Sequence, residues 1–265
     1  KIRRGEDIDL DSIPLDDADV LYEFSRGHTV GIFQVETEAY KRLIKQMGIE
    51  TFEHLTASNA LVRPGPLATV TPAFIARKQG RQAVTYDNEK MREITGDTFG
   101  LIIYQEQLMM ALVEFGGFTQ AEADKARSII GKKRDESAFK PFEEKWMENA
   151  SISLGKTRAK KYWKDFLKHA AYSFNLSHAC AYSMLSYQTM WLKYYYPLEF
   201  IYGLMANEPD KKQITTFILE ARRLGIKVLP PDINDSDMAF SLVGDAVRFG
   251  IHNFNGIGKQ AIVEI

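Results

Sequence analysis

The side chains most able to do chemistry gather between Tyr172 and Thr189, in the sequence YSFNLSHACAYSMLSYQT. Hydroxyls, an amide, an imidazole and aromatic rings stand at the start of a predicted helix, where a surface helix would carry charge. Such groups cost free energy when they are buried unpaired, so they either pair with each other or face a ligand. Asn175, Ser177 and His178 crowd the helix start, where free N–H groups favour anions. We therefore expect these three residues to line an anion-binding site.

His178 also has a plainer interpretation, because a lone His on a helix is usually structural. No second His or Cys lies at zinc-like spacing around it. The alternating carboxylates of Asp7, Asp9 and Asp11 could hold two magnesium ions. They lie, however, in an acidic, solvated arm before Pro14, so we assign no catalytic and no metal-binding residue in this chain.

Basic residues concentrate in one part of the chain. The net charge is -1, but residues 1–60 carry 7 Lys/Arg against 12 Asp/Glu, whereas residues 124–169 carry 13 against 7. A polyanion would therefore bind the second stretch. Arg127, Lys132 and Lys133 surround the end of a predicted helix at Gly131, where cations complement the helix dipole. The run Lys132-Lys133-Arg134 exceeds that need, so we expect phosphate contacts.

Further basic and polar residues are candidates for contact with DNA. Four lysines recur every four residues on one face of a predicted helix, namely Lys156, Lys160, Lys164 and Lys168. This spacing would let them follow a phosphate backbone, but such a basic face can equally be solvated without any partner. Arg63, beside a rigid Pro-Gly-Pro turn, is aimed at a phosphate or pairs with a structural acid. Gln105 begins a helix whose polar side chains could meet a base or sugar.

The elements that must position these residues are mainly helical. In the first half of the chain we expect a helix capped by Thr37 and stopped at Gly48, a helix from about Gln105 to Phe115, and a helix that begins with the capping box Thr119–Glu122 and ends at Gly131. In the second half we expect a helix over 156–170, a helix from about Ser177 to before Pro197, a helix that begins at Pro197, and a helix capped by Asp210 and stopped at Gly225. The run Arg63-Pro64-Gly65-Pro66 should not form regular helix. Residues 239–249 predict a hairpin.

Composition places the chain among globular proteins. Hydrophobic residues make up 45% and aromatic residues 12% of the 265 residues, which argues against disorder. No apolar run reaches the length of a membrane span, and the single cysteine, Cys180, fits a reducing compartment, so we expect a cytoplasmic protein.

Five blocks in the same order resemble the C-family polymerases, the bacterial replicative DNA polymerase alpha subunits. They are GIFQVE at 31–36, LVRPGPL at 61–67, GLIIYQEQ at 100–107, IGKK at 130–133 and the block at 172–189. Two positions depart from the family pattern. Ser128 stands where the family has the second of two arginines, and Leu176 stands where it usually has lysine.

The resemblance implies the fingers domain of a DNA-directed DNA polymerase. It assigns dNTP binding to Arg127, Lys132, Lys133, Asn175, Ser177 and His178. It places Arg63 and Gln105 near the nucleotide or the template. The expected DNA contacts of Lys156, Lys160, Lys164 and Lys168 rest on their spacing alone. Residues 254–263 resemble half of a helix-hairpin-helix motif, in which Gly256, Gly258 and Lys259 would meet a DNA phosphate.

The expected architecture is an acidic segment over 1–20, a helical fingers domain over 21–228 and the start of a DNA-binding region over 229–265. The family's catalytic aspartates and their Mg²⁺ lie in a palm domain that this chain does not match, so the chain alone should be inactive. Partners such as a sliding clamp would bind elsewhere. Two rivals stay open: a non-catalytic nucleic-acid-binding module, and a helical scaffold without a nucleic-acid partner.

Overall fold

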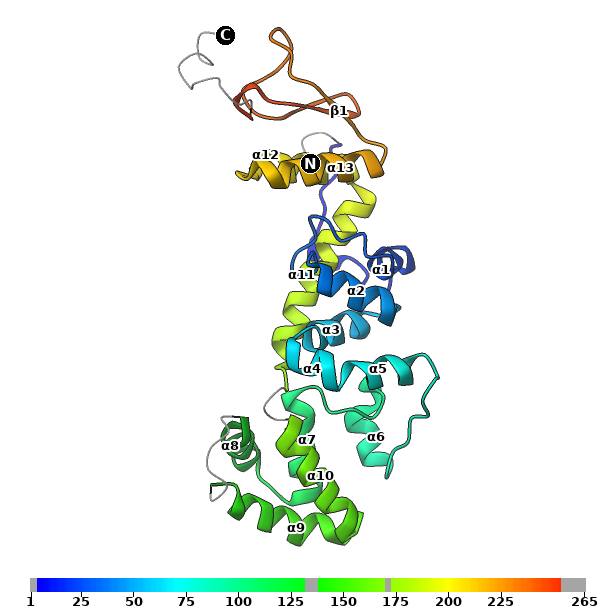
Figure 1. Cartoon of the computed structure of the whole chain (residues 1–265), viewed down its shortest axis with the longest axis vertical. Coiled ribbons are helices and arrows are strands. Elements are labelled where there is room, and N and C mark those ends of the chain that lie inside the picture. Colours follow the sequence, from blue (N-terminus) through cyan, green and yellow to red (C-terminus); the bar gives the residue numbers. More distant parts are fainter. Residues whose placement is uncertain (1–3, 132–137, 170–172, 254–265) are drawn as a thin grey trace. The chain divides into compact units, whose positions relative to one another are not determined.

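The chain divides into two units, and the described residues 4–131, 138–169 and 173–253 of this computed structural model are mainly helical (Figure 1). Unit 1 comprises residues 1–41 and 185–265, and unit 2 comprises residues 42–184. The division falls within two helices, α2 (Glu38–Met47) and α11 (Leu176–Tyr195). The predicted fold class, mainly helical with a small mixed piece near the C-terminus, is confirmed.

Unit 2 is built from helices in its described residues. They are α3 (Phe52–Leu61), α4 (Pro64–Thr69), α5 (Thr71–Lys78), α6 (Glu89–Thr95), the 3₁₀ turn Gly96–Thr98, α7 (Gln105–Gly116), α8 (Gln120–Gly131), α9 (Lys140–Leu154) and α10 (Lys156–His169). Helix α9 packs against α10 and α7, and α7 also packs against α8 (Figure 1). The rings of Trp146 and Trp163 stack between α9 and α10, and the indole N–H of Trp146 donates to the Ala159 carbonyl at 2.8 Å.

The helix signals of unit 2 act as the sequence predicts. Thr119 and Glu122 cap α8 reciprocally, because the Glu122 N–H donates to the Thr119 hydroxyl and the Thr119 N–H donates to the Glu122 carboxylate. The apolar stripe of α10 is buried at Ala159, Trp163 and Phe166. Its exposed face carries the four lysines.

One prediction about unit 2 was wrong. We predicted that the run Arg63-Pro64-Gly65-Pro66 would not be regular helix, but Pro64, Gly65 and Pro66 form the first turn of α4, with Arg63 as the N-cap residue. A proline in the first turn loses no hydrogen bond, since the first N–H groups of a helix have no partner within it. The position of the prolines in the helix, rather than their number, decides the outcome.

Unit 1 contains helices and a small sheet. Its elements, besides the parts of α2 and α11, are the 3₁₀ turn Leu10–Ser12, α1 (Ala18–Ser25), α12 (Pro197–Asn207), α13 (Lys211–Arg223), β1 (Lys227–Leu229), β2 (Ser241–Val243), β3 (Ala246–Arg248) and the 3₁₀ turn Ile251–Asn253. The predicted hairpin is present, because β2 and β3 pair antiparallel with Leu242 opposite Val247. Strand β1 pairs parallel to β3, which gives the order β1-β3-β2. The sheet packs on α12 and α13 (Figure 1).

Most acidic residues of the N-terminal segment are exposed, as expected for a solvated arm, and a few contacts also tie the segment to neighbouring helices of unit 1. Arg4 pairs with Glu199, and the carboxylates of Glu6 and Asp17 accept hydrogen bonds from the hydroxyls of Tyr196 and Tyr195, both at 2.6 Å. Tyrosine hydroxyls on α11 and at its end thus compensate the acidic residues of the segment. None of the described helices is long and apolar enough to cross a membrane.

Candidate nucleotide and nucleic-acid site

Two helix starts of unit 2 lie side by side. Residues Tyr104 and Phe174 form an isolated parallel bridge. The Phe174 N–H donates to the Ile103 carbonyl at 3.0 Å, and the Gln105 N–H donates to the Phe174 carbonyl at 2.9 Å. Helix α7 begins directly after this bridge and α11 begins two residues after it. Because the bridge is parallel, the N-terminal ends of both helices lie close together.

The start of α11 is held by a side chain from each helix. The side-chain amide oxygen of Asn175, Oδ1, accepts a hydrogen bond from the backbone N–H of His178 at 2.7 Å, which is an N-cap contact. The Glu106 carboxylate of α7 accepts hydrogen bonds from the Asn175 amide and from the Leu176 N–H, both at 2.9 Å. Asn175, Ser177 and His178 are nevertheless exposed. This end of α11 is therefore fixed in place but open to a ligand.

Arg127 of α8 belongs to the same cluster. Its guanidinium donates to the Gln105 amide oxygen at 3.2 Å and to the Asp124 carboxylate at 2.7 Å. The Gln105 amide in turn donates to the Ser173 carbonyl at 3.4 Å, a contact at the limit of hydrogen-bond length. Gln105 thus connects Arg127 with the segment that leads into α11.

Arg63 approaches this segment from the side of α4. Its guanidinium carbon lies 4.6 Å from the centroid of the Phe174 ring, a cation–π distance. Burial lowers the pKa of Arg63. The His178 ring packs against Phe174 at 5.4 Å and against Tyr182 at 4.1 Å between centroids. Arg63 thus contacts Phe174 directly, and Arg127 is linked through Gln105 to the same segment. Two guanidinium groups therefore lie near a helix start, an arrangement suited to binding an anion.

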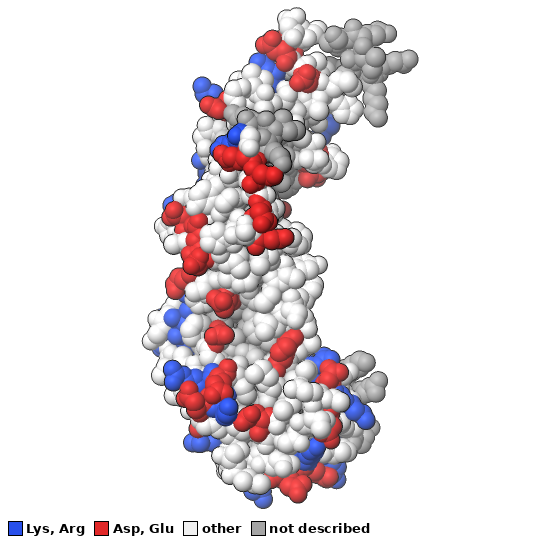
Figure 2. Space-filling model, turned by 180° about the vertical axis from the view of Figure 1, so that it is seen from behind, with Lys and Arg blue, Asp and Glu red and all other residues white. Residues whose placement is uncertain are grey.

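The lysines of α10 form a second basic feature of unit 2. Lys156, Lys160, Lys164 and Lys168 are exposed, and no ion pair joins them to a carboxylate of the described residues. By contrast, Arg158 on the same helix pairs with Asp87 at 3.3 Å. On the face shown in Figure 2, acidic side chains predominate in the middle of the view, and basic and acidic side chains are mixed in its lower part. The regular spacing on α10 thus distinguishes these lysines, rather than a uniformly basic surface.

Comparisons with known proteins show the family of the chain. Residues 1–152 match the model of the bacterial DNA polymerase III alpha subunit finger domain. The chain belongs to this family. Residues 225–265 match a helix-hairpin-helix motif. The resemblance found in the sequence is confirmed at the level of the family.

Curated relatives of the finger domain carry the name DNA polymerase III subunit alpha. The protein of Aquifex aeolicus is 36% identical over 264 residues, which cover 98% of this chain and 23% of the relative. The protein of Mycobacterium tuberculosis is 36% identical over 99% of this chain, and that of Bacillus subtilis is 36% identical over 97% of this chain. Each match covers 23% of the relative. The chain thus spans about a quarter of the length of these relatives.

Some predicted site residues of this finger domain lie outside the described residues. They are Lys132, Lys133, Gly256, Gly258 and Lys259. The structure brings together Arg63, Gln105, Arg127, Asn175 and His178, whereas their roles in binding stay predictions. Among the described residues, no three His, Cys, Asp or Glu side chains gather as a metal site. Asp9 instead caps a 3₁₀ turn by accepting from the Asp11 N–H at 3.1 Å.

Two residues of the finger domain site were missed. Asp124 holds Arg127, and its i, i+3 spacing on one helix could have indicated the pair. Glu106 lies in the first turn of α7, where a carboxylate already complements the dipole of that helix, but it also caps α11, which begins 70 residues later. No local signal indicates such a contact, because it depends on the bridge between Tyr104 and Phe174.

Proposed function

We propose that this chain binds the incoming dNTP and primer–template DNA as the fingers part of a DNA-directed DNA polymerase. The observation that supports it most is the link from Arg127 through Gln105 to the start of α11. This link fixes a guanidinium beside a helix N-terminus, and both features favour phosphate. The names of the relatives, DNA polymerase III subunit alpha, support the same reaction for the longer protein.

In this proposal the triphosphate lies near Arg127 and the start of α11, where it would compete with Glu106 and Asn175 for the N–H groups of Leu176 and His178. The exposed side chains of Asn175, Ser177 and His178 would contact the phosphates or the sugar. Lys132 and Lys133, which follow α8, would add positive charge. Arg63 would face the template or the nucleotide from the opposite side of Phe174.

The DNA backbone would follow the lysines of α10, and the helix-hairpin-helix region would contribute Gly256, Gly258 and Lys259. Two metal-bound aspartates would perform the nucleotidyl transfer in a palm domain that this chain does not contain. Mg²⁺ would be bound by those aspartates in the longer protein. We therefore expect no primer extension by this chain alone. Other replisome subunits, such as a sliding clamp, would bind regions outside it.

A titration of a fluorescent primer–template duplex over a salt series, with and without the matching dNTP and Mg²⁺, tests this proposal. We expect salt-sensitive binding that the correct dNTP tightens. Arg127→Ala should remove the effect of dNTP, whereas Lys125→Ala, which removes an exposed charge from the same helix, should keep it. Replacing the four lysines of α10 by Ala should lower the salt slope by about 3 units.

A second function is favoured by one observation, the helix-hairpin-helix match over 225–265. This function is a nucleic-acid-binding module without a nucleotide site. It predicts salt-sensitive binding that dNTP does not change and that Arg127→Ala leaves intact. That outcome would replace the fingers proposal, and absence of binding at low salt would contradict both.

A further inference from the structure

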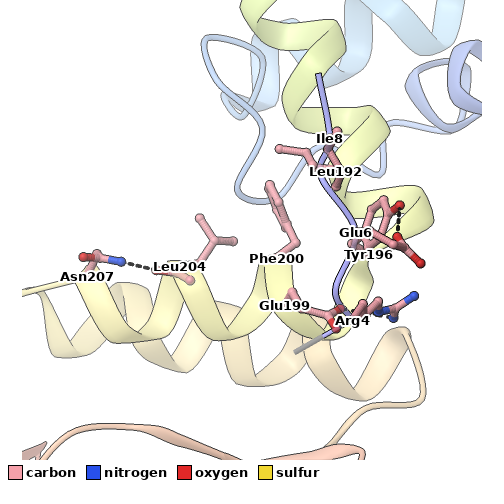
Figure 3. A pocket seen from close by; sticks show the side chains of 10 residues that line it. Arg4, Glu6, Ile8, Leu192, Tyr196, Glu199, Phe200, Leu204 and Asn207 are labelled. Atoms are coloured by element: carbon pink, nitrogen blue, oxygen red, sulfur yellow. Dashed lines mark hydrogen bonds and ion pairs between the residues drawn. The ribbon is translucent and has the colours of Figure 1, made fainter. Parts of the chain in front are cut away.

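The structure contains a pocket in unit 1 that the proposed function does not use. The pocket has a volume of about 450 Å³ and lies between the segment at Arg4–Ile8, the end of α11 and one face of α12 (Figure 3). Its walls are largely apolar, with Ile8 and Leu192 facing Phe200 and Leu204. Pockets of this size and character bury drug-sized ligands.

The charged groups at the rim of the pocket are already compensated. Arg4 donates to the Glu199 carboxylate at 2.9 and 3.2 Å, and the Glu6 carboxylate accepts from the Tyr196 hydroxyl at 2.6 Å. The Arg4 guanidinium also lies 4.9 Å from the centroid of the Tyr196 ring. These charged groups are exposed or half-buried and already have partners beside them, so a charged ligand would gain little free energy from them. The rim thus favours a neutral ligand.

Gly203 also lines this pocket. It lies in the interior of α12, where glycine is less favourable than any residue except proline. Its φ is not in the left-handed region, and a Cβ at this position would meet no atom within 4 Å. Neither a turn nor close packing therefore requires glycine here. Gly31 of the same unit differs, since a Cβ there would overlap Leu204.

The space that the missing side chain of Gly203 leaves is part of the pocket. A larger residue at this position of α12 would project into the volume that a ligand needs. Two aromatic side chains, Phe200 and Tyr196, line the same space and offer ring contacts. Asn207 adds a neutral hydrogen-bonding group at the other end of the α12 face (Figure 3).

We propose that this pocket is a binding site for a neutral, mainly apolar small molecule with a planar aromatic body. The ligand would lie on Phe200 and Leu204, under Ile8 and Leu192. Bound there, it would contact both the N-terminal segment and α12 and so hold the two together. This inference goes beyond the proposed function, since it involves none of the residues assigned to nucleotide or DNA.

A titration with the neutral dye N-phenyl-1-naphthylamine, whose fluorescence rises in apolar surroundings, tests the site. The 265-residue chain should show a saturable, single-site increase. Gly203→Leu should weaken binding by about tenfold or more, because leucine occupies the pocket while favouring the helix. Ala206→Leu, an exposed position of α12 outside the pocket, should bind the dye as the parent chain does. Equal binding by the parent and Gly203→Leu, or no saturable binding, would overturn the proposal.

Displacement of the dye tests the predicted charge of the ligand. Neutral 2-naphthol should displace it at concentrations about tenfold lower than 2-naphthoate or 2-naphthylmethylamine, which carry opposite charges at neutral pH. Equal or better displacement by either charged compound would contradict a neutral ligand. The assay contains neither DNA nor nucleotide, so its result is independent of the test of the proposed function.

Discussion

Two polar clusters of this chain use charge in opposite ways. In unit 1, Lys193 is 3% exposed and its ammonium group lies 2.7 Å from the Glu220 carboxylate, which is 6% exposed. The ammonium group also donates to the carbonyls of His28 and Val30. In unit 2, Arg127 keeps a quarter of its side chain exposed and pairs with Asp124, whose side chain is 58% exposed.

The difference separates structural charge from charge that can bind a ligand. Every donor of Lys193 has an acceptor inside unit 1, so the cluster holds α11, α13 and the loop at 28–30 together. Burial raises the pKa of Glu220, but hydrogen bonds and charge from Arg223 and Lys193 outweigh it and hold that pKa below its ordinary value. The guanidinium groups around Phe174 are half-buried and can reach a phosphate. Variants in the first cluster should therefore change stability, and those in the second mainly binding.

The largest effect is expected for Lys193→Met. This variant leaves Glu220 buried with only Arg223 as its ionic partner, so it should lower the free energy of unfolding by about 3 kcal/mol. Urea unfolding followed by circular dichroism measures the change. Lys212→Met, at an exposed position of α13, should cost less than about 0.5 kcal/mol. Unfolding of Lys193→Met at the urea concentration of the parent chain would show that the cluster does not hold unit 1 together.

A smaller effect is expected from His54, a half-buried group of unit 2 that stays neutral. Burial and, after it, the charge of Lys78 lower the pKa of His54 from 6.5 to about 4, against smaller opposing effects of Glu50 and Glu53. Between pH 6.5 and pH 4, His54 is therefore protonated in the unfolded chain but stays neutral in the folded chain. Stability should be complete above pH 6.5 and fall by up to about 2 kcal/mol towards pH 4, less than the full pKa shift implies because water partly screens the half-buried ring.

Unfolding measured between pH 7 and 4 tests this dependence. His54→Asn keeps an acceptor for the Glu50 N–H, which donates to the ring at 3.3 Å, but it cannot titrate. Its stability should therefore change less over this range than that of the parent chain. The same substitution at the exposed His252 should leave the slope in place. A parent slope that survives His54→Asn would assign the acid sensitivity to other groups.

The two clusters also mark what the sequence could predict. Caps and stops are local, so α2, α8 and α13 were predicted from Thr37, Thr119 and Asp210. The prolines of α4 led to a wrong prediction, because the sequence does not show that they occupy the first turn until the start of the helix is known. The pair of Lys193 with Glu220 and the cap of α11 by Glu106 join distant segments, and only the packed fold brings them together.

The smallest effect sharpens the comparison at the start of α11. Asn175→Ala removes the N-cap acceptor of the His178 N–H and the amide that donates to Glu106. It should lower the free energy of unfolding by about 1 kcal/mol. Ser177→Ala, two residues away and exposed, makes a matched control, because Ser177 has no hydrogen bond to another described side chain; its cost should stay below about 0.5 kcal/mol.

Both variants should weaken the effect of dNTP on DNA binding if this helix start contacts the nucleotide. The two variants would then differ in stability but not in their dNTP response, because Asn175 hydrogen-bonds Glu106 and the His178 N–H, whereas the Ser177 side chain makes no hydrogen bond within the described part of the chain. A loss of stability without any change in dNTP response would instead make the start of α11 structural, like the Lys193 cluster. The contrast between the two clusters would then lie in exposure alone.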